Sequence, residues 1–134
     1  MPTARYYPAV GAINGTLYVA GGAGPEPGGV ALAVVDAYDP STNSWTSRAS
    51  VPVAGVWSSS GVLGNRLYVI GGSMVGDVPG SLKAYDPATS SWETGPSLPK
   101  GSAASAVVNG ILYAVVNGYT FAGPGDPCLG CWDY

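Results

Sequence analysis

Histidine is absent from this sequence of 134 residues, and charged residues are scarce. Without histidine the chain cannot form a Ser-His-Asp triad or a Cys-His pair, and no imidazole is available as a metal ligand. Only 10% of the residues are charged, and the five Lys and Arg residues stand singly along the chain. Because no basic patch can neutralise a phosphate backbone, we expect no nucleic-acid partner.

Long apolar runs are also missing. No stretch approaches the roughly 18 apolar residues that a membrane span requires. The N-terminal MPTARYYPAV lacks the apolar core of a signal peptide. We therefore expect no membrane association. The sequence leaves the location unknown, and the default expectation is a cytoplasmic one because no signal peptide is visible.

Glycine and proline are abundant, with 21 Gly and 12 Pro residues, and 46% of the chain is apolar. Disorder usually requires low hydrophobicity, which this sequence does not have. The glycines and prolines interrupt short apolar runs. This arrangement predicts an all-β domain of many short strands joined by turns.

A repeat of about fifty residues organises the chain. The aligned segments are YYPAVGAINGTLYVAGG (6–22), VWSSSGVLGNRLYVIGG (56–72) and GSAASAVVNGILYAVVN (101–117). Each has a run of small residues, a turn containing Asn and Gly, which tolerate positive φ, and an apolar run. The apolar run shows no alternation, which predicts a strand buried on both faces. Each unit is expected to be a meander of four strands, A to D.

A second motif, DPSTNSW at 39–45, returns as DPATSSW at 86–92, and each copy follows a tyrosine. Asp-Pro starts a turn, and the turn brings a tryptophan to the outermost strand, where it can pack as a large anchor. We therefore interpret Asp39 and Asp86 as turn formers. The double glycines, tyrosines and tryptophans mark the repeat: Gly21, Gly22, Tyr38, Trp45, Gly71, Gly72, Tyr85 and Trp92.

These marks resemble the kelch repeat, and the resemblance implies four-stranded blades of a β-propeller. We expect one domain over residues 1–134, with blade 1 at about 2–50, blade 2 at about 51–97 and an incomplete blade 3 at about 98–134. The third unit departs from the pattern, because Val116-Asn117 stands where Gly-Gly belongs and no last strand is expected.

Slightly under three blades is fewer than the four to eight of known propellers. An open stack would expose apolar sheet faces, which normally mark an interface. We expect closure by oligomerisation, with a homodimer supplying about six blades. The partner's N-terminal MPTARYY could supply the last strand, or that strand could be absent. The alternative is that the chain is a fragment of a longer propeller.

The B–C loops (23–30, 73–80, 119–130) and the D–A loops (47–57, 94–104) are expected at one end of the blades. The kelch resemblance implies that partners commonly bind there. The binding candidates are charged or aromatic residues of these loops: Glu26, Arg48, Asp77, Lys100, Tyr119 and Phe121. Trp57 is expected to pack between blades instead.

The leading interpretation is a non-enzymatic binding or scaffold module that recognises a protein or a carbohydrate. One alternative is a sugar-active propeller enzyme of the epimerase or lyase type, using acidic, Tyr and Arg groups. The other is a structural or truncated kelch product without a ligand of its own. No catalytic residue is assigned.

Cys128 and Cys131 form the one conspicuous chemical motif, a C-x-x-C. A redox pair usually needs a helix N-terminus to lower the pKa of one thiol, and no helix is expected here. A zinc site would need a second pair of ligands from another chain. Plain thiols or a short-loop disulfide are the favoured interpretation, so the two are weak metal candidates and no cofactor is expected.

Overall fold

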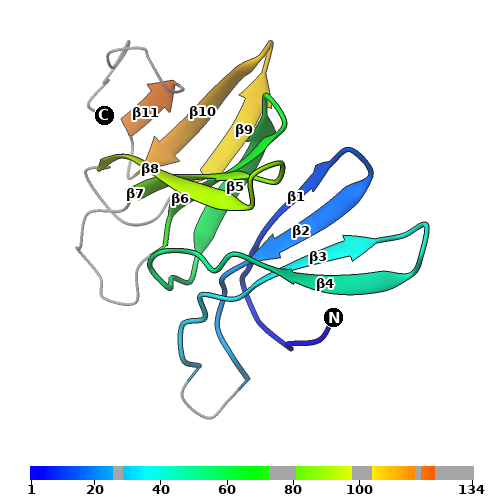
Figure 1. Ribbon diagram of the computed structural model, residues 1–134. Coiled ribbons are helices and arrows are strands. Elements are labelled where there is room, and N and C mark those ends of the chain that lie inside the picture. The colour runs from blue at the N-terminus through cyan, green and yellow to red at the C-terminus, as the bar shows by residue number, and fades with distance from the viewer. Residues whose placement is uncertain (26–28, 73–80, 98–103, 117–118, 123–134) are drawn as a thin grey trace.

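The computed structural model describes residues 1–25, 29–72, 81–97, 104–116 and 119–122. In this part of the chain there are eleven strands and no helix, and the strands form three antiparallel sheets (Figure 1). The prediction of an all-β chain with four-stranded blades and an incomplete propeller is confirmed.

Sheets 1 and 2 each have four strands that neighbour one another in chain order. Sheet 1 contains β1 (Ala9–Ile13), β2 (Thr16–Ala20), β3 (Val35–Asp39) and β4 (Ser44–Arg48). Sheet 2 contains β5 (Ser58–Leu63), β6 (Arg66–Gly71), β7 (Ser81–Asp86) and β8 (Ser91–Ser97). Sheet 3 has three described strands, β9 (Ala104–Val108), β10 (Ile111–Val116) and β11 (Tyr119–Ala122).

The hairpin turns follow from their residues. In the β1–β2 turn, Asn14 and Gly15 have φ of 49° and 79°, the left-handed conformation that Asn and Gly adopt at least cost. In the β3–β4 turn, the Asp39 carboxylate accepts hydrogen bonds from the Ser41 hydroxyl (2.7 Å) and amide (2.8 Å). These bonds hold the pKa of Asp39 below its ordinary value. Asp86 accepts the equivalent bond from the Ala88 amide at 2.9 Å, as a turn former should.

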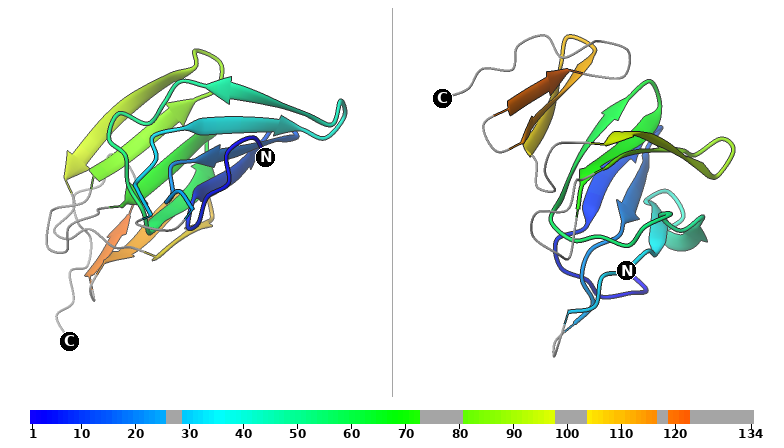
Figure 2. Two further views of the ribbon diagram at one scale, coloured as in Figure 1. Left: turned by 90° about the horizontal axis from the view of Figure 1, so that it is seen from below. Right: turned by 90° about the vertical axis from the view of Figure 1, so that its left-hand side faces the viewer.

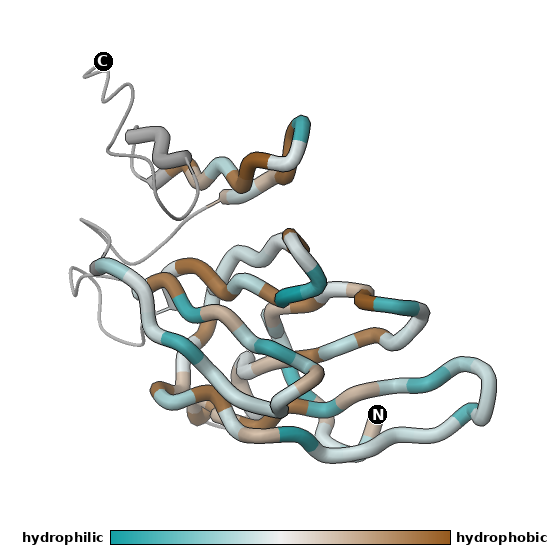
Figure 3. The backbone as a smooth tube through the Cα atoms, turned by 45° about the horizontal axis from the view of Figure 1, so that its top comes forward, coloured by the Kyte–Doolittle hydropathy of each residue, from teal (hydrophilic) through white to brown (hydrophobic). Residues whose placement is uncertain are grey.

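The three sheets lie side by side in chain order, with their first strands β1, β5 and β9 adjacent and their outer strands diverging (Figures 1 and 2). The core therefore lies between sheets. Apolar segments occupy the strands of all three sheets, and hydrophilic residues gather at the hairpins (Figure 3). One core cluster joins sheets 1 and 2 around Tyr18, Leu67 and Tyr85, and a second joins sheets 2 and 3 around Tyr68 and Leu112.

The N-terminal segment is tied to sheet 1 by a buried ion pair. The Arg5 guanidinium binds the Asp36 carboxylate, and both side chains are almost fully buried. The same guanidinium donates to the Val34 carbonyl at 2.8 Å. The segment MPTARYY is thus anchored to its own sheet, which argues against its use as the last strand of a partner's blade.

Candidate functional site at the loop end

The β2–β3 and β4–β5 connections meet at one end of the sheets, as expected for B–C and D–A loops. The Gly22 amide donates to the Gly55 carbonyl at 3.1 Å, and the Val51 amide donates to the Ala33 carbonyl at 2.8 Å. Backbone hydrogen bonds therefore join the two loops, and this end offers a fixed surface rather than separate loops.

The double glycine of sheet 1 permits this close packing. Gly22 has φ of 96°, and a Cβ built on it would lie 2.6 Å from the Tyr6 carbonyl oxygen, too close for any side chain. The Tyr6 and Ala23 backbones exchange two hydrogen bonds of 2.8 Å beside it. A glycine is required here because three backbone segments approach one another.

Three exposed aromatic residues lie at this end, and we call them the aromatic trio: Tyr6, Tyr7 and Trp57. The exposed fractions of Tyr7 and Trp57 are 64% and 58%. The ring centroids of Tyr6 and Tyr7 are 6.4 Å apart, and those of Tyr7 and Trp57 are 6.3 Å apart. These spacings are typical of aromatic rings in contact, so the trio forms one continuous aromatic surface.

An unusual backbone conformation holds two members of the trio. Tyr7 and Trp57 have φ of 52° and 57°, a left-handed conformation that is rare for bulky residues and costs roughly 1–3 kcal/mol. The two residues occupy the same position in their repeats, just before β1 and β5. Strain that recurs at an exposed position is a feature more often of recognition sites than of folding cores.

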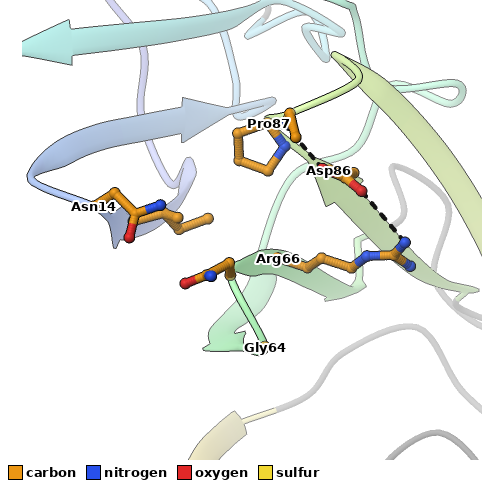
Figure 4. Close-up of a pocket in the computed structure, with 8 residues that line it drawn as sticks. Asn14, Gly64, Arg66, Asp86 and Pro87 are labelled. Atoms are coloured by element: carbon orange, nitrogen blue, oxygen red, sulfur yellow. Dashed lines mark hydrogen bonds and ion pairs between the residues drawn. The ribbon is translucent and has the colours of Figure 1, made fainter.

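A cleft lies at the opposite end of the sheets, between the turns of sheets 1 and 2 (Figure 4). This cleft of about 350 Å³ is lined by Ile13, Asn14, Gly64, Asn65, Arg66, Asp86, Pro87 and Ala88. The Arg66 guanidinium donates to Glu93 at 2.7 Å and to Asp86 at 3.3 Å. The hydrogen bond to Glu93 raises the pKa of Arg66 above its ordinary value. The charged groups at this cleft are therefore paired with one another.

The repeated sheets, the double glycines and the tyrosine–tryptophan pairs agree with an independent comparison of the sequence with known families. A model of the kelch motif matches residues 4–52 and 58–99. The chain belongs to the kelch-repeat family. An F-box/kelch-repeat protein of Arabidopsis thaliana is 39% identical over 64 residues, which are 48% of this chain and 13% of that protein. The match thus spans only a small part of the relative's length.

The tyrosine and the tryptophan that mark each kelch repeat form an aromatic pair. The rings of Tyr38 and Trp45 are 4.9 Å apart, and those of Tyr85 and Trp92 are 5.1 Å apart, each across an outer hairpin. Tyr85 is fully buried, whereas Tyr38 is only partly buried because no further sheet covers it among the described residues. The Trp92 indole donates to the carbonyl of Ala49, the residue after β4, at 2.8 Å, which links neighbouring kelch blades.

The expectation that Trp57 packs between blades is wrong. Its positive φ turns the chain so that the ring reaches solvent beside Tyr7, and Val56 is buried in its place, with an exposed fraction of 2%. Sequence reasoning missed the trio as a group. The available signal was the aromatic residue at the same position of two aligned kelch repeats.

The predicted binding residues that the structure describes are not gathered at the trio. Arg48 is exposed at the end of β4, and three strand spacings, roughly 14 Å, separate that strand from β1. Tyr119 and Phe121, expected on a loop, lie on β11, because that strand pairs directly with β10 in a hairpin. The remaining candidates, Glu26, Asp77, Lys100, Cys128 and Cys131, lie outside the described residues.

Within the described ranges, no helix is long and apolar enough to cross a membrane. The same residues hold no group of three or more Cys, Asp or Glu side chains arranged to bind a metal ion.

Proposed function

We propose that this kelch protein is a non-enzymatic binding module whose loop end recognises a protein or a carbohydrate through the aromatic trio. The observation that carries the proposal is the contact between three exposed rings, two of them held by a left-handed backbone. Tyrosine and tryptophan are enriched at binding hot spots because they bury a large area at a small cost in side-chain entropy.

The size of the trio sets its share of the binding energy. Aromatic side chains bury roughly 150–250 Å² each when they are covered. Tyr6, Tyr7 and Trp57 are each more than half exposed to solvent. Covering all three would contribute on the order of 5–10 kcal/mol, before an association cost of about 4 kcal/mol or more. The trio can therefore anchor a partner, but tight binding needs further loop contacts.

The chemistry of the loop end indicates which partners fit. Val30 and Val53 are also exposed on the loops of this end, with exposed fractions of 70% and 62%. An aromatic and aliphatic surface suits the apolar face of a sugar ring or an uncharged, extended peptide. Arg48 and the other charged candidates from the sequence would serve as rim contacts rather than as anchors.

We propose the same division of the chain as the repeats indicate, one domain with blade 1 at about 2–50, blade 2 at about 51–97 and blade 3 at about 98–134. We also propose that the partners include another copy of this chain. A homodimer would bring the loop ends of about six blades around one axis, within the usual size range of propellers.

A sugar-active enzyme is the competing candidate. Such an enzyme needs carboxyl groups free to act as acid and base. In the cleft of Figure 4, Asp86 is bound to Arg66. The same Arg66 also binds Glu93, which does not line the cleft, so both carboxylates are committed to ion pairs. The open aromatic surface thus favours binding over catalysis.

The test combines binding screens with the variant Trp57→Gly. The probes are an array of neutral oligosaccharides and a library of uncharged extended peptides. For a probe that binds, Trp57→Gly is expected to weaken affinity by at least about 30-fold, the effect of a hot spot of roughly 2 kcal/mol. Its melting temperature should not fall, because glycine relieves the positive φ of this position.

The matched control is Trp57→Phe, which keeps an aromatic ring and should retain most of the affinity. The proposal is contradicted if Trp57→Gly and Tyr7→Ala bind the probe as well as the parent protein. A fall in melting temperature for Trp57→Gly would indicate a structural role instead. Turnover of a bound sugar would favour the enzyme.

A further inference from the structure

Each sheet has two chemically different faces, because side chains alternate along a strand. We call the face that carries Leu17, Leu67 or Leu112 the Leu face. The opposite face carries Tyr18, Tyr68 or Tyr113, and we call it the Tyr face. The Leu and Tyr residues occupy equivalent positions in the three aligned repeats.

Both contacts between sheets join a Tyr face to a Leu face. Tyr18 of sheet 1 lies against Tyr85 of sheet 2, with ring centroids 5.6 Å apart. On the next contact, a Cβ built on Gly61 of sheet 2 would lie 2.6 Å from Leu112 Cδ1 of sheet 3. The stack therefore has a direction, and its two ends are not alike.

The ends of the described stack leave one face of each kind uncovered. On the Leu face, Leu17 of sheet 1 is 36% exposed, whereas the equivalent Leu67 and Leu112 are 0% and 3% exposed. On the Tyr face, Val115 of sheet 3 is 46% exposed, whereas the equivalent Ile70 is 1% exposed. The exposed residues are thus those that a neighbouring sheet would bury.

At one position, the two uncovered faces also carry residues of complementary size. In the internal contacts a glycine of the Tyr face meets a valine of the Leu face: Gly11 with Val62, and Gly61 with Val107. A Cβ on Gly11 would lie 2.6 Å from Val62 Cγ2, so the position excludes a methyl group. The uncovered Tyr face has Ala106 there, and the uncovered Leu face has Ala12 in place of valine. The added methyl group on one face is offset by the smaller residue on the other.

From this match we infer that the Tyr face of sheet 3 packs on the Leu face of sheet 1 of a second copy of this chain. The inference deepens the assembly proposed above and rests on it. Two copies make the contact twice and close a two-fold ring of about six sheets, because a head-to-tail contact forms a ring when its rotation closes. Tyr113 then meets Tyr38 of the second copy, as Tyr18 meets Tyr85.

One feature of the internal contacts is not repeated. The Ser60 hydroxyl donates to the Val10 carbonyl at 2.8 Å, and the Ser105 hydroxyl donates to the Ser60 carbonyl at 3.0 Å. The equivalent residue on the Leu face of sheet 1 is Val10, which has no hydroxyl group and is 48% exposed. The contact between copies is therefore held by apolar burial and can dissociate on dilution.

The test uses Leu17→Glu on the Leu face and Ala106→Lys on the Tyr face, both at exposed or partly exposed positions. Light scattering of the parent protein should give twice the 13.4 kDa of one chain at high concentration. Each variant alone should be a monomer. Both copies carry the same substitution, so both contacts of the dimer would include a changed face. Thr42→Lys, on the exposed β3–β4 turn, is the control and should remain a dimer.

An equal mixture of the two variants is the decisive sample. Mixing should restore the dimer, because the unchanged Tyr face of the Leu17→Glu chain meets the unchanged Leu face of the Ala106→Lys chain. At the other contact, the introduced acid lies opposite the introduced base. A monomeric parent protein, a dimer that survives in Ala106→Lys, or no recovery on mixing would each overturn the inference.

Probe binding measured on the same samples separates this inference from the proposed function. A monomer that binds its probe through the trio would leave the binding function standing without this interface. A dimer that follows the expected mixing pattern but binds no probe would leave the interface standing without the function.

Discussion

At the residue scale, the buried pair of Arg5 and Asp36 belongs to blade 1 and is not repeated in blade 2. The equivalent residues of blade 2 are Gly55 and Lys83, so the charge on the third strand is reversed. Lys83 is also buried, and burial lowers its pKa below the ordinary value. The two blades thus share a backbone but bury different polar groups at equivalent positions.

The variant Arg5→Met tests the role of this pair. We expect it to lower the free energy of unfolding by about 3–5 kcal/mol, because it leaves the Asp36 carboxylate buried without its partner. Urea denaturation measures the change. The double variant Arg5→Met/Asp36→Leu should recover most of the loss, since an apolar pair needs no desolvation of charge.

Arg48→Met is the matched control for Arg5→Met, because Arg48 is exposed. Its effect is expected to stay within about 0.5 kcal/mol, as for most surface substitutions. Equal effects of the two substitutions would show that the buried pair contributes nothing beyond a surface charge.

At the element scale, the contact between sheets depends on size matching across the A strands. Gly11 lies on β1 against Val62 on β5, and the two residues leave no room for an added methyl group. Close-packed interiors respond to single methyl groups in this way. The same relation carries the inference about Ala106 and Ala12, so it can be tested inside one chain.

The variants Gly11→Ala and Val62→Ala form a double-mutant cycle. We expect Gly11→Ala to cost about 1–3 kcal/mol by overpacking. In the double variant the smaller residue makes room, so the loss should be less than the sum by roughly 1 kcal/mol or more. Thermal and urea unfolding measure all four proteins. Additive effects would contradict size matching and would remove the support it gives to the second-copy interface.

At the scale of the whole molecule, the uncovered Leu and Tyr faces connect stability to assembly. A partner that binds only the folded state raises its stability by mass action. If two copies close the ring, the melting temperature of the parent protein should rise with protein concentration. Differential scanning fluorimetry over a hundredfold concentration range measures this rise. The monomeric variant Leu17→Glu should melt at one temperature throughout, and an unchanging parent protein would argue against the dimer.

Local features were predictable from the sequence because they depend on residues close along the chain. The A–B turns follow from Asn and Gly with positive φ, and the C–D turns follow from Asp39 and Asp86. The hydrophobic B strands followed from unbroken apolar runs. These local patterns, repeated along the chain, were sufficient to predict four-stranded kelch blades.

The repeat, the strands and the turns follow from the sequence alone, since backbone preferences and hydrophobic patterns act over short distances. Which surfaces are covered depends instead on the packing of the sheets. The exposure of Trp57, the pairing of Arg5 with Asp36 and the difference between Leu17 and Leu67 all depend on residues distant in sequence. Burial is a property of two surfaces in contact. The sequence predicted that an open stack would expose apolar faces, but which residues lie on those faces, and that Trp57 joins Tyr7 in an exposed trio, follows only from how the sheets are placed together.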